Sequence, residues 1–258
     1  MIFDTHAHYD DEQFDQDRYE VIERVHKENV GNILNVGIDI KTSKTSISLA
    51  RKYDFVYSAV GVHPHEVEKA PENYIDILED LINKNREKVV AIGEIGLDYY
   101  YDFAPRDLQQ KFFVEQIRLA KKLNLPVSIH DRDAHKDTLD IIKQEDVGEI
   151  SGILHCFSGS MEMANEVLKS GLYIGIGGVV TFKKSKKIVD IVKNVPMDKL
   201  LVETDLPYLT PEPYRGKRNE SSYIKYVIDK IAEIKDMAPQ EVEDITTKNA
   251  KRLFKIEQ

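Results

Sequence analysis

The sequence predicts an α/β protein with a single (β/α)₈ barrel, the TIM-barrel architecture, over residues 1–258. Eight apolar, β-branched runs recur along the chain, and an amphipathic stretch follows each of them. The runs are continuously hydrophobic, as expected of parallel strands that are buried on both faces. A chain of 258 residues is also of the usual length for this fold and long enough to bury a large core.

The expected strands and helices alternate along the whole chain. The runs that we interpret as strands cover residues 2–6, 31–36, 55–60, 88–93, 126–130, 150–155, 172–176 and 200–204. Helical patterns lie near residues 17–29, 42–52, 73–85, 106–123, 134–145, 161–170, 185–193 and 221–236, and Pro239 opens a further helix over 239–253. No segment rich in glycine, serine and proline divides the chain, which indicates one domain. A doubly wound open sheet shows the same alternation and is the structural alternative.

Composition and charge narrow the class of protein. Charged residues make up 31% and hydrophobic residues 41% of the chain, as in globular proteins. The net charge of −9 repels polyanions, which argues against a general nucleic-acid coat protein but not against an enzyme that binds phosphate at a metal centre. One cysteine, Cys156, excludes an internal disulfide framework. Without an apolar run of about 18 residues or a signal-peptide pattern, we expect a cytoplasmic protein with no membrane contact.

A His-x-His pair follows the first apolar run, in Asp4-Thr5-His6-Ala7-His8. If residues 2–6 form a strand, alternation places His6 and His8 on the same side. Two imidazoles in this arrangement can bind one metal ion. A pair of this kind also arises by chance and then lies in solvent, so the rest of the chain has to decide between the two interpretations.

Other residues of metal-ligand type stand at the ends of the later strands. Glu94, His130, His155 and Asp205 follow the fourth, fifth, sixth and eighth apolar runs. Each alone could be a hydrogen-bonded boundary residue or a helix cap. Barrel enzymes place their chemistry at the carboxyl ends of the strands, so the four histidines and two carboxylates are predicted to converge on one rim. Burying such a set without a cation is costly, and imidazole with carboxylate suits zinc, manganese or magnesium.

These residues lie in segments that resemble the TatD-type metal-dependent deoxyribonucleases of the amidohydrolase superfamily. The matching segments occur in the family's order and nearly span the chain: Asp4–His8, Gly61–His65, Gly93–Tyr99, Ile129–His130, His155–Gly159, Glu203–Asp205 and Tyr214–Glu220. Each segment is weakly specific alone and specific in combination. Asp131, where a small polar residue is expected, and Ser221, where proline is expected, depart from the pattern but are not proposed ligands.

The resemblance implies two divalent ions and a nuclease activity. His6, His8 and Asp205 would hold one ion, His130 and His155 the other, and Glu94 both. Paired ions activate water and clamp a phosphodiester, and Asp205 could accept the proton of that water. Glu94, Asp205 and His63 are therefore the expected catalytic residues, with His63, Arg215 and Arg218 near the substrate. His63 could equally pack the loop after the third strand, and the arginines could be solvated.

The expected substrate is DNA or a nucleotide phosphodiester, and no obligate protein partner is indicated. The same metal pair could hydrolyse another ester, a lactone or an amide, and a non-catalytic metal-binding scaffold is a further alternative. Glu203 is expected to hold a ligand instead of binding metal, and Cys156 to fill the core. The run Tyr99–Tyr101 could stack on bases, although tyrosines at the rim of any pocket would look the same. The lysines over 183–187 are expected on a solvated helix face.

Overall fold

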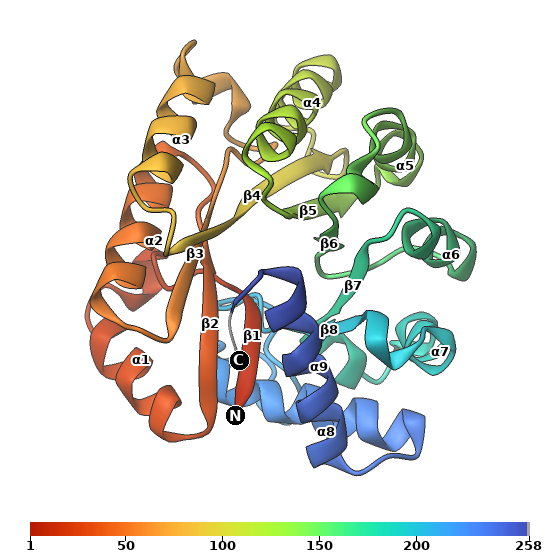
Figure 1. Cartoon of the computed structure of the whole chain (residues 1–258). Coiled ribbons are helices and arrows are strands. Elements are labelled where there is room, and N and C mark those ends of the chain that lie inside the picture. Colours follow the sequence, from red (N-terminus) through yellow and green to blue (C-terminus); the bar gives the residue numbers. More distant parts are fainter. Residues whose placement is uncertain (257–258) are drawn as a thin grey trace.

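The computed structural model describes residues 1–256, and its centre is a sheet of eight parallel strands in the order β1 to β8 (Figure 1). The strands are β1 (Ile2–Ala7), β2 (Val30–Val36), β3 (Val56–Val60), β4 (Val89–Asp98), β5 (Val127–Arg132), β6 (Gly152–Leu154), β7 (Tyr173–Ile176) and β8 (Leu200–Val202). Each strand pairs with the next in the sequence, because a helix between them carries the chain back to the start of the sheet.

The last strand returns to the first and nearly closes the barrel. Ala7 forms a parallel bridge with Leu206, and the Asp205 amide donates to the His6 carbonyl at 2.9 Å. The His8 amide donates in turn to the Leu206 carbonyl at 3.0 Å. A doubly wound sheet would instead leave β1 inside the sheet, where the strand order reverses. The barrel prediction is therefore confirmed, and the open-sheet alternative is excluded.

An outer ring of helices covers the strands (Figure 1). The helices are α1 (Arg18–Lys27), α2 (Ile40–Lys52), α3 (Tyr74–Asn83), α4 (Arg106–Leu123), α5 (His135–Gln144), α6 (Met161–Lys169), α7 (Lys186–Asn194), α8 (Ile224–Lys235) and α9 (Pro239–Leu253). Hydrogen-bonded caps fix where several helices begin. The side chain of Asp39 accepts from the Thr42 amide at the start of α2, and that of Ser160 accepts from the Met163 amide at the start of α6. No helix within residues 1–256 is both long and apolar enough to cross a membrane. The cytoplasmic location stays a prediction.

Helix α9 covers the end of the barrel at which the strands begin. Leu253 and the following Phe254 form a buried cluster with strand residues that include Phe3 and Leu201. The rings of Phe3 and Phe254 are 5.7 Å apart. Apolar side chains therefore pack this end of the barrel, and the buried residues of metal-ligand type lie at the other end.

The predicted ends of several strands are wrong. The strand predicted over 88–93 continues to Asp98, because β4 pairs with β5 as far as Asp98 opposite Arg132. Glycine makes this close pairing possible: Gly96 has a φ of +139°, and a Cβ there would lie 2.0 Å from the carbonyl oxygen of His130. Glu94 thus lies within β4 instead of after it. The strands predicted over 150–155 and 200–204 end earlier, at Leu154 and Val202, and the helix predicted over 221–236 begins as a 3₁₀ turn over Ser221–Tyr223.

The Gln116 side chain of α4 holds the backbone that leads into His63. Its Oε1 accepts from the Val62 amide at 2.7 Å, and its Nε2 donates to the Val62 carbonyl at 3.0 Å. Gln116→Leu leaves both buried Val62 groups without these partners, so we expect the free energy of unfolding to fall by about 2–4 kcal/mol in urea titration. Lys111→Ala on the exposed side of α4 is the control and should stay within about 0.5 kcal/mol. Equal stability of the two variants would contradict this role.

Candidate functional site

The six side chains predicted as metal ligands meet at the carboxyl end of the barrel. They lie on, or shortly after, the five strands β1, β4, β5, β6 and β8, and they are His6, His8, Glu94, His130, His155 and Asp205. His6 and Glu94 are buried at 0% and 4% exposure, so the set lies inside the rim and not on its surface.

The Glu94 carboxylate occupies the middle of this group. Its Oε2 lies 3.4 Å from Nε2 of His6 and 3.6 Å from Nε2 of His8. Its Oε1 lies 2.8 Å from Nδ1 of His130 and 3.7 Å from Nε2 of His155. One carboxylate oxygen therefore faces each pair of histidines.

Asp205 closes the group on the side of β8. Its Oδ1 lies 3.6 Å from Nε2 of His8 and 3.8 Å from Nε2 of His155. Its backbone adopts a left-handed conformation, with a φ of +56°, and its amide is held by the His6 carbonyl. This turn directs the carboxylate back toward the pair from β1.

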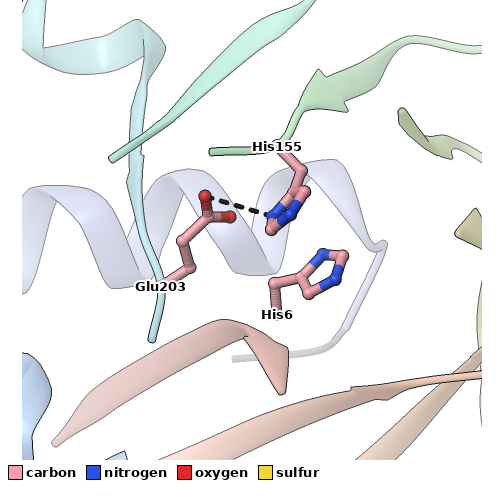
Figure 2. Close-up of side chains that lie close together, drawn as sticks. All are labelled: His6, His155 and Glu203. Carbon is pink, nitrogen blue, oxygen red and sulfur yellow. Dashed lines mark ion pairs between the residues drawn. The ribbon is translucent and has the colours of Figure 1, made fainter. Parts of the chain in front are cut away.

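Each of the four histidines has one ring nitrogen facing this centre and the other facing a partner outside it. Three outer contacts are His8 Nδ1 to the Val36 carbonyl at 2.8 Å, His6 Nδ1 to Ser128 Oγ at 3.3 Å and His130 Nε2 to Asp98 Oδ2 at 3.2 Å. The fourth joins His155 Nδ1 and Glu203 Oε1 at 3.3 Å, and Figure 2 shows this pair beside His6. Carbonyl and carboxylate oxygens only accept, so the outer nitrogens of His8 and His130 carry a hydrogen. Where a cation takes the place of a proton at the inner nitrogens, these can act as lone-pair donors, as in histidines that bind metals.

The donor set fits divalent cations. His6 Nε2 and His8 Nε2 lie 3.1 Å apart, although two lone pairs at this distance repel unless a proton or an ion lies near them. No lysine or arginine within residues 1–256 forms an ion pair with Glu94 or Asp205. Imidazole nitrogen and carboxylate oxygen are the ligands preferred by zinc and manganese, and carboxylate also suits magnesium. His6, His8 and Asp205 are one group whose ligand atoms all lie within 4.8 Å of one another.

The pKa shifts of the site residues indicate that the site attracts positive charge. Burial would lower the pKa of His8, but its hydrogen bond to Asp205 and the charge of Glu94 raise it to about 10. The pKa of His130 also rises to about 10, because Asp98 and Glu94 outweigh burial. Burial would raise the pKa of Glu94, yet the surrounding histidines hold it well below its usual range. The carboxylates thus stay ionised and draw positive charge into the centre, which bound cations would supply in place of protons.

His63 lies in the same centre but presents a hydrogen instead of a lone pair. The His65 amide donates to His63 Nδ1 at 3.1 Å, so in the neutral ring Nε2 carries the hydrogen. Burial holds the pKa of His63 well below its usual range, which keeps the ring neutral. Its Nε2 lies 3.7 Å from Glu94 Oε1. This arrangement suits a hydrogen-bond donor to a bound anion better than a metal ligand.

A sequence profile of the family described as TatD related DNase matches residues 3–255. The chain belongs to this family. A metal-dependent hydrolase of Bacillus subtilis, YabD, is 50% identical over 99% of this chain and 100% of its own length. A protein of Cronobacter sakazakii named 3'-5' ssDNA/RNA exonuclease TatD is 35% identical over 98% of this chain and 97% of its own length. The crystal structure of YjjV, a TatD homologue of Escherichia coli, superposes with a TM-score of 0.93 at 30% identity, covering 99% of this chain and 98% of that one.

The TatD resemblance of the sequence is thereby confirmed. By family membership the chain is a metal-dependent hydrolase, and the His, Asp and Glu groups described above could hold metal. The nuclease activity and the number and identity of the ions remain proposals.

Asp98 is a site residue to which the sequence analysis assigned no role. It is fully buried, and its Oδ2 contacts His65 Nε2 at 2.8 Å and His130 Nε2 at 3.2 Å. The two hydrogen bonds outweigh burial and lower its pKa far below the usual range. A signal was available: Asp98 stands four positions after Glu94, and strand alternation puts both on one face. The strand was predicted to end before either residue.

Glu203 lies where the sequence predicts it, whereas Cys156 does not. Glu203 is fully buried and accepts from the Cys156 amide, and its contact with His155 places it behind a proposed ligand, as expected. Gly175 leaves room for it, since a Cβ there would lie 2.7 Å from the Glu203 carboxylate. Cys156 was expected to fill the core, but its sulfur lies within 4.8 Å of the ligand atoms of His155 and Asp205. That prediction is wrong because the chain has left β6, and a φ of +45° at Cys156 ends the strand alternation.

The two arginines predicted to bind substrate lie apart from the six central residues and differ from each other. Arg218 pairs with both carboxylate oxygens of Asp17, at 2.9 and 2.6 Å, and its guanidinium lies 4.3 Å from the Phe14 ring centroid. Arg215 is exposed and lies over the Phe182 ring at 4.0 Å, in a hollow that it lines with Lys183 and Lys184. Arg215 is free to meet an anion, whereas Arg218 is held in an ion pair.

Glu94→Gln tests whether the central carboxylate holds cations. It keeps the size of the side chain but removes the negative charge that would attract cations, so we expect fewer bound divalent ions per chain by elemental analysis. The variant should also lose most of the rise in melting temperature on adding zinc or manganese, because a ligand stabilises only the state that binds it. Glu243→Gln is the matched control: this buried glutamate pairs with the amino terminus at the other end of the barrel. Unchanged metal content in Glu94→Gln would exclude a bridging role.

Proposed function

We propose that this chain is a deoxyribonuclease that cleaves DNA phosphodiester bonds with two divalent ions. The observation that carries the proposal is the central position of Glu94, with one oxygen facing the histidines of β1 and the other facing His130 and His155. The family description and the name of the Cronobacter relative support a nucleic-acid substrate.

The ligand assignment follows this division. His6, His8 and Asp205 would hold one ion, His130 and His155 the other, with Glu94 shared. Zinc, magnesium and manganese all suit these donors. When bound, such a pair supplies Lewis-acid activation of water and charge compensation for phosphate oxygens.

The protein groups then have separate tasks. Asp205 remains ionised, because His155 and His8 outweigh burial and lower its pKa, so it can accept a proton from the attacking water. The neutral His63 can donate its Nε2 hydrogen to a phosphate oxygen or to the leaving group. Arg215 would bind a flanking phosphate with Lys183 and Lys184, which line the same hollow. For Arg218 we propose a structural role, holding the loop after β8 against Asp17.

A cleavage assay tests the proposed function directly. We expect the metal-loaded protein to release nucleotides from a labelled single-stranded oligonucleotide, a chelator to stop the release, and zinc, manganese or magnesium to restore it. A model carboxylic ester, a lactone and an amide serve as competing substrates. Metal-dependent turnover of one of these without any DNA cleavage would overturn the proposal in favour of a different hydrolase, and no turnover at all would favour a metal-binding scaffold.

The variants Asp205→Asn and Arg215→Ala should change different kinetic constants. Asp205→Asn removes a ligand charge and the proton acceptor, so kcat should fall by about 10²- to 10⁴-fold. Arg215→Ala should chiefly raise KM, while Arg51→Ala on the outer helix α2 serves as its control. With few phosphates neutralised, log affinity should fall with log salt at a slope of about −1 to −2. A slope steeper than about −5 would contradict so small a cationic surface.

A further inference from the structure

The loop between β4 and α4 exposes a group of aromatic side chains beside the metal centre. Tyr100, Tyr101 and Phe103 are 58%, 46% and 61% exposed. They follow Asp98, the last residue of the strand that carries Glu94. Three large apolar side chains left in solvent within four residues need a physical reason, because such patches mark binding surfaces.

These three side chains form an ordered surface. The rings of Tyr101 and Phe103 stack at 5.2 Å with 22° between their planes, and Tyr100 meets Tyr101 edge-on at 5.0 Å. The Arg132 guanidinium, from the end of β5, lies 4.2 Å from the Tyr100 ring and 4.7 Å from the Tyr101 ring. Cation–π contact and stacking fix the rings before any ligand arrives. We call Tyr100, Tyr101, Phe103 and Arg132 the aromatic platform.

A chain of direct contacts joins the platform to the centre. The His65 ring meets Phe103 edge-on at 4.9 Å, and its Nε2 lies 2.8 Å from Asp98 Oδ2. The same Oδ2 contacts His130, whose other nitrogen contacts Glu94. Asp98 Oδ1 accepts from the amides of Tyr100 and Tyr101 at 3.0 and 2.9 Å. One carboxylate therefore positions both a proposed metal ligand and the start of the platform.

Tyr99 has a different task from its neighbours. Its hydroxyl donates to Asp137 at 2.8 Å and accepts from Gln110, and the Arg106 guanidinium covers its ring at 4.3 Å. These contacts anchor the loop to α4 and α5. The sequence offered Tyr99–Tyr101 as the residues that could stack on bases. In the structure Tyr99 anchors the loop, and the exposed rings are those of Tyr100, Tyr101 and Phe103.

We propose that the aromatic platform stacks an unpaired nucleobase of the strand whose phosphodiester occupies the metal centre. This inference rests on the proposed function and deepens it by naming the residues that would receive a base of an unpaired strand or a frayed end. Every base has a π face, whereas bases inside a duplex have both faces covered, so stacking selects unpaired bases without reading sequence. Arg132 adds a positive charge that complements the phosphates beside such a base. An apolar protein partner would leave this charge without a counter-charge.

The test uses the metal-loaded protein and a fluorescent strand. The probe is a phosphorothioate-linked single-stranded hexanucleotide with 2-aminopurine at its 3′ end, whose fluorescence falls when the base stacks. We expect quenching on binding to the unaltered protein, and about tenfold weaker binding with reduced quenching for Phe103→Ala and Tyr101→Ala. Phe103→Trp should restore both signals, and Phe103→Leu should restore neither fully, since leucine keeps apolar area without a π face. Tyr19→Ala, which removes an equally exposed ring on α1, is the matched control.

The outcomes separate this inference from the proposed function. A strand with an abasic 3′ end should bind the unaltered protein and Phe103→Ala equally, with metal content unchanged in the variant. Equal quenching by Phe103→Ala and the unaltered protein overturns the platform even when DNA is cleaved. Quenching without cleavage of an unmodified strand supports the platform and overturns the nuclease proposal. A change in oligomeric state on Phe103→Ala, measured by sedimentation, would assign the surface to a second copy of the chain instead.

Discussion

The site depends on the second ring nitrogen of each histidine. Imidazole has two nitrogens, and a partner that only accepts hydrogen bonds fixes which of them presents a lone pair. Val36 and Asp98 supply such partners for His8 and His130, and Glu203 faces the outer nitrogen of His155 at 3.3 Å. For His63 a backbone amide donates to the outer nitrogen, and the inner one keeps its hydrogen. The same residue type thus presents different atoms to the centre, a nitrogen that can offer a lone pair in some places and an N–H group in another.

The barrel brings separate strands to one rim, which allows a histidine on one strand to contact a partner on another. The partners of the histidines lie on β2, β4 and the segment after β8, none of them on the same strand as the histidine they hold. Closure through Ala7 and Leu206 joins β1 to the segment after β8. The apolar cluster around Phe254 lies at the opposite end, where the buried Glu243 pairs with the amino terminus, whereas the buried charges of the rim lie where cations can compensate them.

The acidic character of the chain constrains how a polyanion reaches this rim. With a net charge of −9, the protein as a whole repels nucleic acid, and attraction has to be local. Arg132, Arg215, Lys183 and Lys184 all lie in loops or strand ends at the carboxyl side of the barrel. Together with the proposed ions and the rings of the aromatic platform, they would offer contacts to a short stretch of one strand and not to a long duplex.

The sequence alone determined the alternation of strands and helices, the barrel and the six central residues, because hydrophobic period and position at strand ends are local properties that the topology converts into one rim. It did not determine the length of β4, the role of Asp98 or the turn of Cys156 toward the site. Nor did it determine that Arg218 pairs with Asp17, or that Tyr99 anchors its loop while Phe103 is exposed. Each of these rests on a contact between residues far apart in the chain or on backbone that has left a strand, where alternation no longer says which way a side chain points. Only the tertiary structure places those partners.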